Sequence, residues 1–132
     1  MISLIYTIIV MGSIYGTENA ISAFLFSSFL LKIRKNNINN IFFYCDGVLN
    51  GNKMFYIAKD EHNLIDSWYY LSKEFSINLN ICSSAAYRRG VIDDDMALDL
   101  GFLHGNLHSA FKLTGLGTLV KSIFSSDRVV QF

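Results

Sequence analysis

ISLIYTIIV, residues 2–10, and the glycine-bearing segment MGSIYG that follows, residues 11–16, give the first indication of the fold. The first segment is apolar on both faces and rich in β-branched residues, which is typical of a strand covered on both sides in a parallel sheet. It is about half as long as a membrane-spanning helix must be, and no basic residues precede it as in a signal peptide. We interpret it as a buried strand of a protein that is neither exported nor membrane-spanning.

Helical and strand patterns alternate along the rest of the chain. The apolar stripe from Leu64 to Phe75 has the four-three-four spacing of a helix with one buried face. Thr17 and Asp60 are the expected N-caps of the first two helices. Strands are expected at about 41–45, 77–82, 111–113 and 128–132, and helices at about 17–34, 60–75, 83–89, 93–100 and 116–124. The alternation predicts an α/β fold of three layers, α/β/α, with a mainly parallel sheet of about five strands, in a single domain over residues 1–132.

Composition excludes several classes of protein. Of the 132 residues, 52% are apolar and 17% are charged, so the chain is too hydrophobic for a disordered protein and could reserve some apolar surface for partner chains. Lys and Arg together number 11, as do Asp and Glu, and the densest basic cluster is KIRK at 32–35. Because this cluster falls where the first helix should end, before an Asn-rich connection at 36–40, we interpret it as a helix terminus and expect no direct nucleic-acid binding. The two cysteines form no CxxC pair, which favours reduced thiols in the cytoplasm.

Three segments follow the carboxyl ends of expected strands: 12–17, 45–52 and 82–89. Reactive groups in open parallel sheets collect beyond this edge. Cys82 stands where a strand passes into the expected start of a helix, and it is the candidate nucleophile. Cys45 lies at the same edge; we interpret it as a buried inert residue, with a resolving thiol for Cys82 as the alternative.

The neighbours of Cys82 are expected to favour its thiolate, which is the reactive form. Amide groups of Ser83 and Ser84 would point toward the sulfur from the helix start, and Arg88 and Arg89 add positive charge. An ordinary buried cysteine of the core explains the position of Cys82 equally well.

Other motifs are incomplete. The segment GSIYGT, residues 12–17, lacks the ending of a Walker loop, although a phosphate could bind at the helix start that follows it. His104 and His108 have no evident third ligand for zinc, and Asp93–Asp95 resemble a helix cap. No metal or organic cofactor is expected.

Several longer blocks resemble one known family. The blocks are YGT at 15–17, FFYCDGVLN at 42–50, LNICSSAAYRRGVID at 79–93, TGLGTL at 114–119 and DRVVQF at 127–132. Over its whole length the chain resembles the DsrE/TusD family of sulfur-relay proteins, most closely its TusD branch. The active cysteine of the family falls in the block that contains RRG, where Cys82 is the matching position. Cys45 is not part of the family pattern.

The resemblance implies a DsrE-like fold and a cytoplasmic sulfurtransferase that relays persulfide sulfur through Cys82 toward 2-thiolation of the tRNA wobble uridine. It also implies TusB-like and TusC-like partner subunits in a heterohexamer, a TusA-like donor and a TusE-like acceptor. Such transfer requires an exposed, stabilised thiolate and neither metal nor organic cofactor.

Three alternatives stay open. The chain could be a non-catalytic structural subunit of a DsrE-type assembly, with the chemistry on partner chains. It could be a DsrE homologue of a sulfur-oxidation pathway. Finally, the strand–glycine turn–helix pattern at residues 2–34 allows a flavodoxin-like nucleotide or phosphate binder that uses residues 12–17.

Overall fold

The computed structural model describes residues 2–33 and 35–132. Within these residues the strands are β1 (Ile5–Val10), β2 (Asn37–Phe43), β3 (Leu79–Cys82), β4 (Phe111–Thr114) and β5 (Arg128–Gln131). They form one five-stranded sheet in the order β4-β3-β2-β1-β5, and every neighbouring pair is parallel. The predicted parallel α/β sheet is confirmed.

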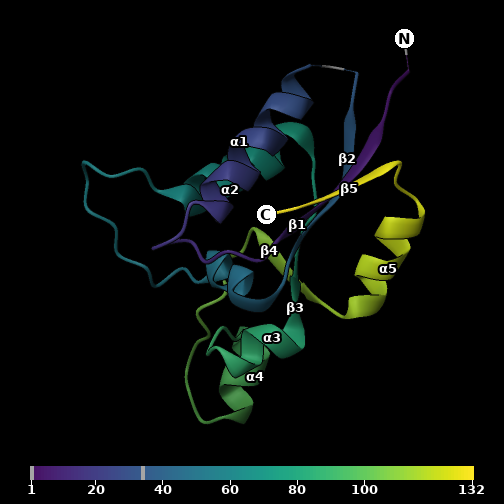
Figure 1. The fold of residues 1–132 in the computed structure, drawn as a ribbon. Helices are drawn as coiled ribbons and strands as arrows, with labels where there is room; N and C mark the ends of the chain where they lie inside the picture. Colours follow the sequence, from purple (N-terminus) through teal and green to yellow (C-terminus); the bar gives the residue numbers. More distant parts are fainter. Residues whose placement is uncertain (1, 34) are drawn as a thin grey trace.

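Helices cover both faces of this sheet. Those of the described chain are α1 (Asn19–Lys32), α2 (Leu64–Phe75), α3 (Ser83–Arg88), α4 (Asp94–Asp99), α5 (Leu116–Phe124) and the 3-10 helix η1 (Cys45–Gly51). Figure 1 shows α1 and α2 together on one face, α5 on the other, and α3 and α4 beyond the end of β3. The three layers agree with the predicted architecture.

Apolar burial on the α1 and α2 face holds that layer to the sheet. Trp68 of α2 is fully buried, with its ring edge-on to Phe43 of β2 at 5.2 Å and to Phe24 of α1 at 5.4 Å between centroids. Edge-to-face aromatic packing of this kind adds about 1 kcal/mol to the burial of each ring. The predicted stripe on α2 therefore faces the core, as its spacing indicated.

A polar seam lies under α5 on the opposite face. Asn80 of β3 donates from Nδ2 to Oδ1 of Asn40 at 2.7 Å, and Asn40 donates from Nδ2 to Oγ of Ser122 in α5 at 2.9 Å. Thr7 of β1 donates its hydroxyl to the carbonyl of Ser122 at 3.2 Å. These buried polar groups are tolerated because each has a partner. The seam identifies Asn40 and Asn80 as side chains of the α5 face, and because side chains alternate along a strand, Cys82 lies on that face too.

The structure corrects two of the predicted caps. Asn63, and not Asp60, caps α2, since its Oδ1 accepts the amides of Ile65 and Asp66. Glu18 precedes α1 without a side-chain cap, and the hydroxyl of Thr17 donates instead to the carbonyl of Ser13. The cap predicted at Asp93 is confirmed by its bond from the amide of Met96.

Two segments that we predicted to lack regular secondary structure in fact have it. Residues 37–40, expected to belong to an Asn-rich connection, begin β2. Residues 46–51, for which we predict neither helix nor strand, belong to η1, with Gly47, Val48 and Asn50 buried. Arg34, the expected helix end and part of the KIRK cluster, lies outside the described residues. In the described ranges, no helix combines the length and the apolar character needed to cross a bilayer.

His108, in the segment before β4, makes the stability of the fold depend on pH. Burial lowers the pKa of its ring below the usual 6.5. The negative charge of Asp66 raises this pKa and the positive charge of Lys53 lowers it further, but burial has the largest effect. Its Nδ1 also accepts the amide of Ala110 at 3.0 Å, which requires that nitrogen to be unprotonated. The unfolded chain therefore takes up this proton at higher pH than the folded chain, and stability falls as the pH drops below about 6.5.

We expect His108→Asn to flatten this part of the pH dependence, because the Asn oxygen can accept the same amide but does not titrate. Urea midpoints of parent and variant at pH 7.5 and pH 5.0 measure the effect. An equal drop in both proteins would show that His108 is not the group responsible.

Candidate functional site

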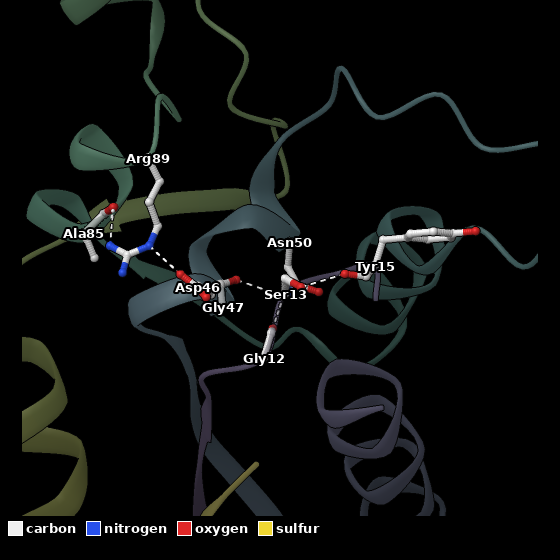
Figure 2. A network of polar contacts seen from close by, with 8 residues as sticks. All are labelled: Gly12, Ser13, Tyr15, Asp46, Gly47, Asn50, Ala85 and Arg89. Atoms are coloured by element: carbon white, nitrogen blue, oxygen red, sulfur yellow. Dashed lines mark hydrogen bonds and ion pairs between the residues drawn. The ribbon is translucent and has the colours of Figure 1, made fainter. Parts of the chain in front are cut away.

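The three segments singled out at the carboxyl edge of the sheet do meet there, because β1, β2 and β3 are neighbours and parallel. Asn50 of η1 joins the first two of them: its Nδ2 donates to the carbonyls of Gly12 at 3.1 Å and Gly47 at 2.8 Å, as Figure 2 shows. Its Oδ1 accepts the indole N–H of Trp68 at 3.2 Å. The rim of the sheet is thus tied to the aromatic core beneath it.

Arg89, which is expected to add positive charge near Cys82, is paired with Asp46. Its Nε lies 2.8 Å from Oδ1 of Asp46 and its Nη1 donates to the carbonyl of Ala85 at 3.2 Å (Figure 2). The guanidinium therefore ties α3 to η1. Because the pair is partly exposed, it contributes at most about 1 kcal/mol to stability. Arg88 is exposed at the last residue of α3.

Cys82 ends β3 and precedes the first residue of α3. The prediction of an exposed thiol is wrong for the described chain, since Cys82 is only 3% exposed. Its side chain also accepts no capping hydrogen bond, so the expected cradle of Ser83 and Ser84 amides is not formed. The reason is the pleat: Cys82 still has an extended backbone, φ −62° and ψ 115°, and its side chain follows the alternation of β3 toward the α5 face.

Thr114 is the residue that sequence reasoning missed. It pairs with Cys82 across β4 and β3, and paired residues on neighbouring strands project to the same face. Its Oγ1 is buried and has no hydrogen-bond partner in the described ranges. The sequence places Thr114 in the block TGLGTL, just after the strand predicted at 111–113. Only the strand order reveals its place beside the thiol.

Cys45 differs from its prediction as well. It is partly exposed and not part of the buried core, and its backbone has a positive φ of 51°. Both cysteines are free thiols.

These exposures predict how the two thiols react. In the native protein, iodoacetamide should modify Cys45 faster than Cys82 by a factor of about ten or more, since reaction requires access to the thiolate. Peptide mapping after timed quenching measures both rates, and in urea the difference should disappear. Faster modification of Cys82 in the native state would mean that the structure around this buried thiol opens readily without a partner chain.

Comparisons with known proteins agree on one family. Residues 5–132 match the DsrE/DsrF-like family. The chain is 50% identical to sulfurtransferase TusD of Buchnera aphidicola subsp. Acyrthosiphon pisum (strain APS) over 127 residues, which cover 96% of this chain and 98% of that protein. It is 42% identical to sulfurtransferase TusD of Photorhabdus laumondii over 132 residues, covering 100% of both. The crystal structure of the ychN protein from E. coli superposes with a TM-score of 0.73 at 15% identity, covering 99% of this chain and 100% of that one, a likeness of fold alone.

Proposed function

This chain belongs to the DsrE/DsrF-like family and is a TusD-type sulfurtransferase of the sulfur relay for tRNA 2-thiouridine, and we propose that Cys82 is the residue on which the sulfur travels. The observation that supports Cys82 most strongly is its position. It ends an inner strand of the parallel sheet, at the edge where such folds place reactive groups. Cys45, the other thiol, begins η1 and is a residue that the family pattern does not require.

The proposed transfer is an exchange between sulfur atoms. The thiolate of Cys82 attacks the terminal sulfur of a donor persulfide, R–S–SH, and forms a new S–S bond while the donor leaves as R–S⁻. The next carrier's thiolate then attacks the terminal sulfur on Cys82, takes it as its own persulfide, and releases Cys82 as a thiolate. Atoms and charge balance in both steps, and neither step uses a metal or an organic cofactor.

The burial of Cys82 adds a condition to this mechanism. A donor sulfur cannot reach a side chain that is 3% exposed, so the cover over Cys82 must open when donor or acceptor docks. The exposed segment 115–117 directly follows Thr114, the neighbour of Cys82. We propose that the site opens at this exposed segment.

Partner subunits fit the exposed apolar surface. We propose that TusB-like and TusC-like chains join this one in a cytoplasmic heterohexamer, with a TusA-like donor and a TusE-like acceptor docking at the carboxyl edge of the sheet. Exposed side chains of α5 support this: Leu116 is 47%, Val120 49% and Phe124 85% exposed. Apolar patches of this kind are rarely left uncovered in working assemblies.

A labelled-sulfur assay tests the function. The protein is incubated with a cysteine desulfurase, ³⁵S-cysteine and a TusA-like carrier, and then with a TusE-like acceptor. We expect label on this chain that dithiothreitol releases as sulfide, followed by its appearance on the acceptor. The matched control is the double variant Cys45→Ser/Cys82→Ser, and equal label on parent and control would contradict the proposal.

The burial of Cys82 also favours a second candidate, a structural subunit whose partners carry the sulfur. It predicts normal tRNA thiolation by an assembly that contains Cys82→Ser. It further predicts loss of thiolation when Val120→Asp disrupts the α5 surface.

A further inference from the structure

We propose that Thr114 stabilises the persulfide on Cys82 by donating its hydroxyl hydrogen bond to the terminal sulfur. This inference rests on the proposed function of Cys82 and assigns a second residue to it. The site would be selective for the sulfur-loaded state, because the hydroxyl gains a partner only when the additional sulfur atom is present.

The placement of the two side chains carries the inference. Cys82 and Thr114 pair at the carboxyl ends of β3 and β4, where strands lie about 4.8 Å apart. Both side chains project toward the α5 face, as the seam through Asn80 shows for β3. The sulfur and the hydroxyl are therefore side-chain neighbours on one face of the sheet.

The hydroxyl of Thr114 is unusual in this protein. Its oxygen is buried and has no hydrogen-bond partner among the described residues, the thiol of Cys82 included. The buried hydroxyl of Thr7, at the far side of the same face, bonds both Ser122 and Ser126. Folded proteins rarely bury a hydroxyl without a partner, since this costs free energy that a bond would recover. An exception beside the proposed nucleophile points to a ligand atom that the empty protein lacks.

A persulfide supplies such an atom. Loading adds one sulfur about 2.05 Å beyond Sγ. In the transfer, the Cys82 thiolate bonds the terminal sulfur of the donor, and the donor's own S–S bond breaks to leave a thiolate. The terminal sulfur on Cys82 is an acceptor for the Thr114 hydroxyl, and the bond is charge-assisted when the persulfide is ionised.

The helix α5 begins at Leu116, two residues beyond Thr114. Gly115 is the N-cap of α5 and provides no side chain to cap the first amides of the helix. The helix dipole there favours negative charge, which adds to the effect of the hydroxyl.

Two substitutions at Thr114 test the inference, both in a Cys45→Ser background. Thr114→Val keeps the shape but removes the hydroxyl, and Thr114→Ser keeps the hydroxyl. Each protein is equilibrated with a TusA-like carrier in its persulfide and thiol forms, and the persulfide on Cys82 is quantified by mass spectrometry after alkylation. We expect about tenfold weaker loading for Thr114→Val and loading within about twofold of the parent for Thr114→Ser.

Thermal unfolding of the unloaded proteins separates this role from a structural one. Thr114→Val should unfold at the parent's temperature or above it, because it removes a buried hydroxyl that has no partner. A clear loss of stability would show that the hydroxyl is already bonded, and equal loading of Thr114→Val and the parent would show that it does not touch the persulfide. Either result overturns the role of Thr114. Absence of persulfide on Cys82 in the Cys45→Ser parent would instead overturn the proposed function.

Discussion

Cys82→Ser should stop sulfur relay through this protein, lowering transfer to the acceptor by a factor of about 10³ or more. A serine hydroxyl is not ionised at neutral pH and forms no persulfide, so the variant has no atom to accept the sulfur. Because Cys82 is a buried core residue, the smaller oxygen also loosens the packing around it, and some loss of stability is expected beside the loss of relay. A reconstituted relay that ends in tRNA thiolation measures the loss, with thermal unfolding run alongside.

Cys45→Ser is the matched control for this result. It makes the same atomic change at the other thiol, which is partly exposed, and should retain relay within about twofold because no step of the proposed exchange uses it. If Cys82→Ser is still folded and relays as well as Cys45→Ser, the chain is a structural subunit.

Gly47→Ala should be the most damaging single change to the fold. A Cβ at this buried position would lie 1.9 Å from the carbonyl oxygen of Val10 and 2.7 Å from its carbon. That carbonyl also accepts the amide of Tyr44 at 2.9 Å, so the added methyl would separate η1 from the end of β1. Neither group is a flexible side chain that could move aside. We expect a loss of about 3 kcal/mol or more and a melting temperature lower by about 10 °C.

Gly117→Ala provides the comparison for that substitution. Its Cβ would meet no atom within 4 Å, and the residue lies inside α5. Alanine is the better helix former, so this variant should be more stable by up to about 1 kcal/mol. Urea unfolding of both variants measures the pair. A stability for Gly47→Ala near that of the parent would mean that η1 does not sit against Val10 as described.

The hydrophobic pattern was sufficient to predict the layers of the fold. The double-sided apolar run of β1 and the stripe on α2 each admit one interpretation, because a strand buried on both faces and a helix buried on one have different periods. The Asn-rich start of β2 could not be predicted. Asn40 is buried there only because Asn80 and Ser122 are hydrogen-bonded to it, and those partners come from distant parts of the chain.

The candidate site also has some features that the local sequence predicts and others that it does not. The position of Cys82 at the end of a strand follows from local sequence, and this prediction is confirmed. Its burial depends on β3 turning this side chain toward α5, and the pairing of Arg89 depends on Asp46 in a separate segment. Thr114 becomes a neighbour of Cys82 only through the pairing of β3 with β4. Such facts belong to tertiary structure, and local patterns do not contain them.

The proposal that sulfur travels on Cys82 is tested most directly by locating the sulfur. The parent protein, loaded by a TusA-like persulfide carrier, is alkylated without reductant and digested, and each cysteine peptide is examined by mass spectrometry. We expect one additional sulfur atom on the peptide that contains Cys82 and none on the peptide that contains Cys45. Additional sulfur confined to Cys45, or found on neither peptide while the assembled partners become loaded, would contradict it.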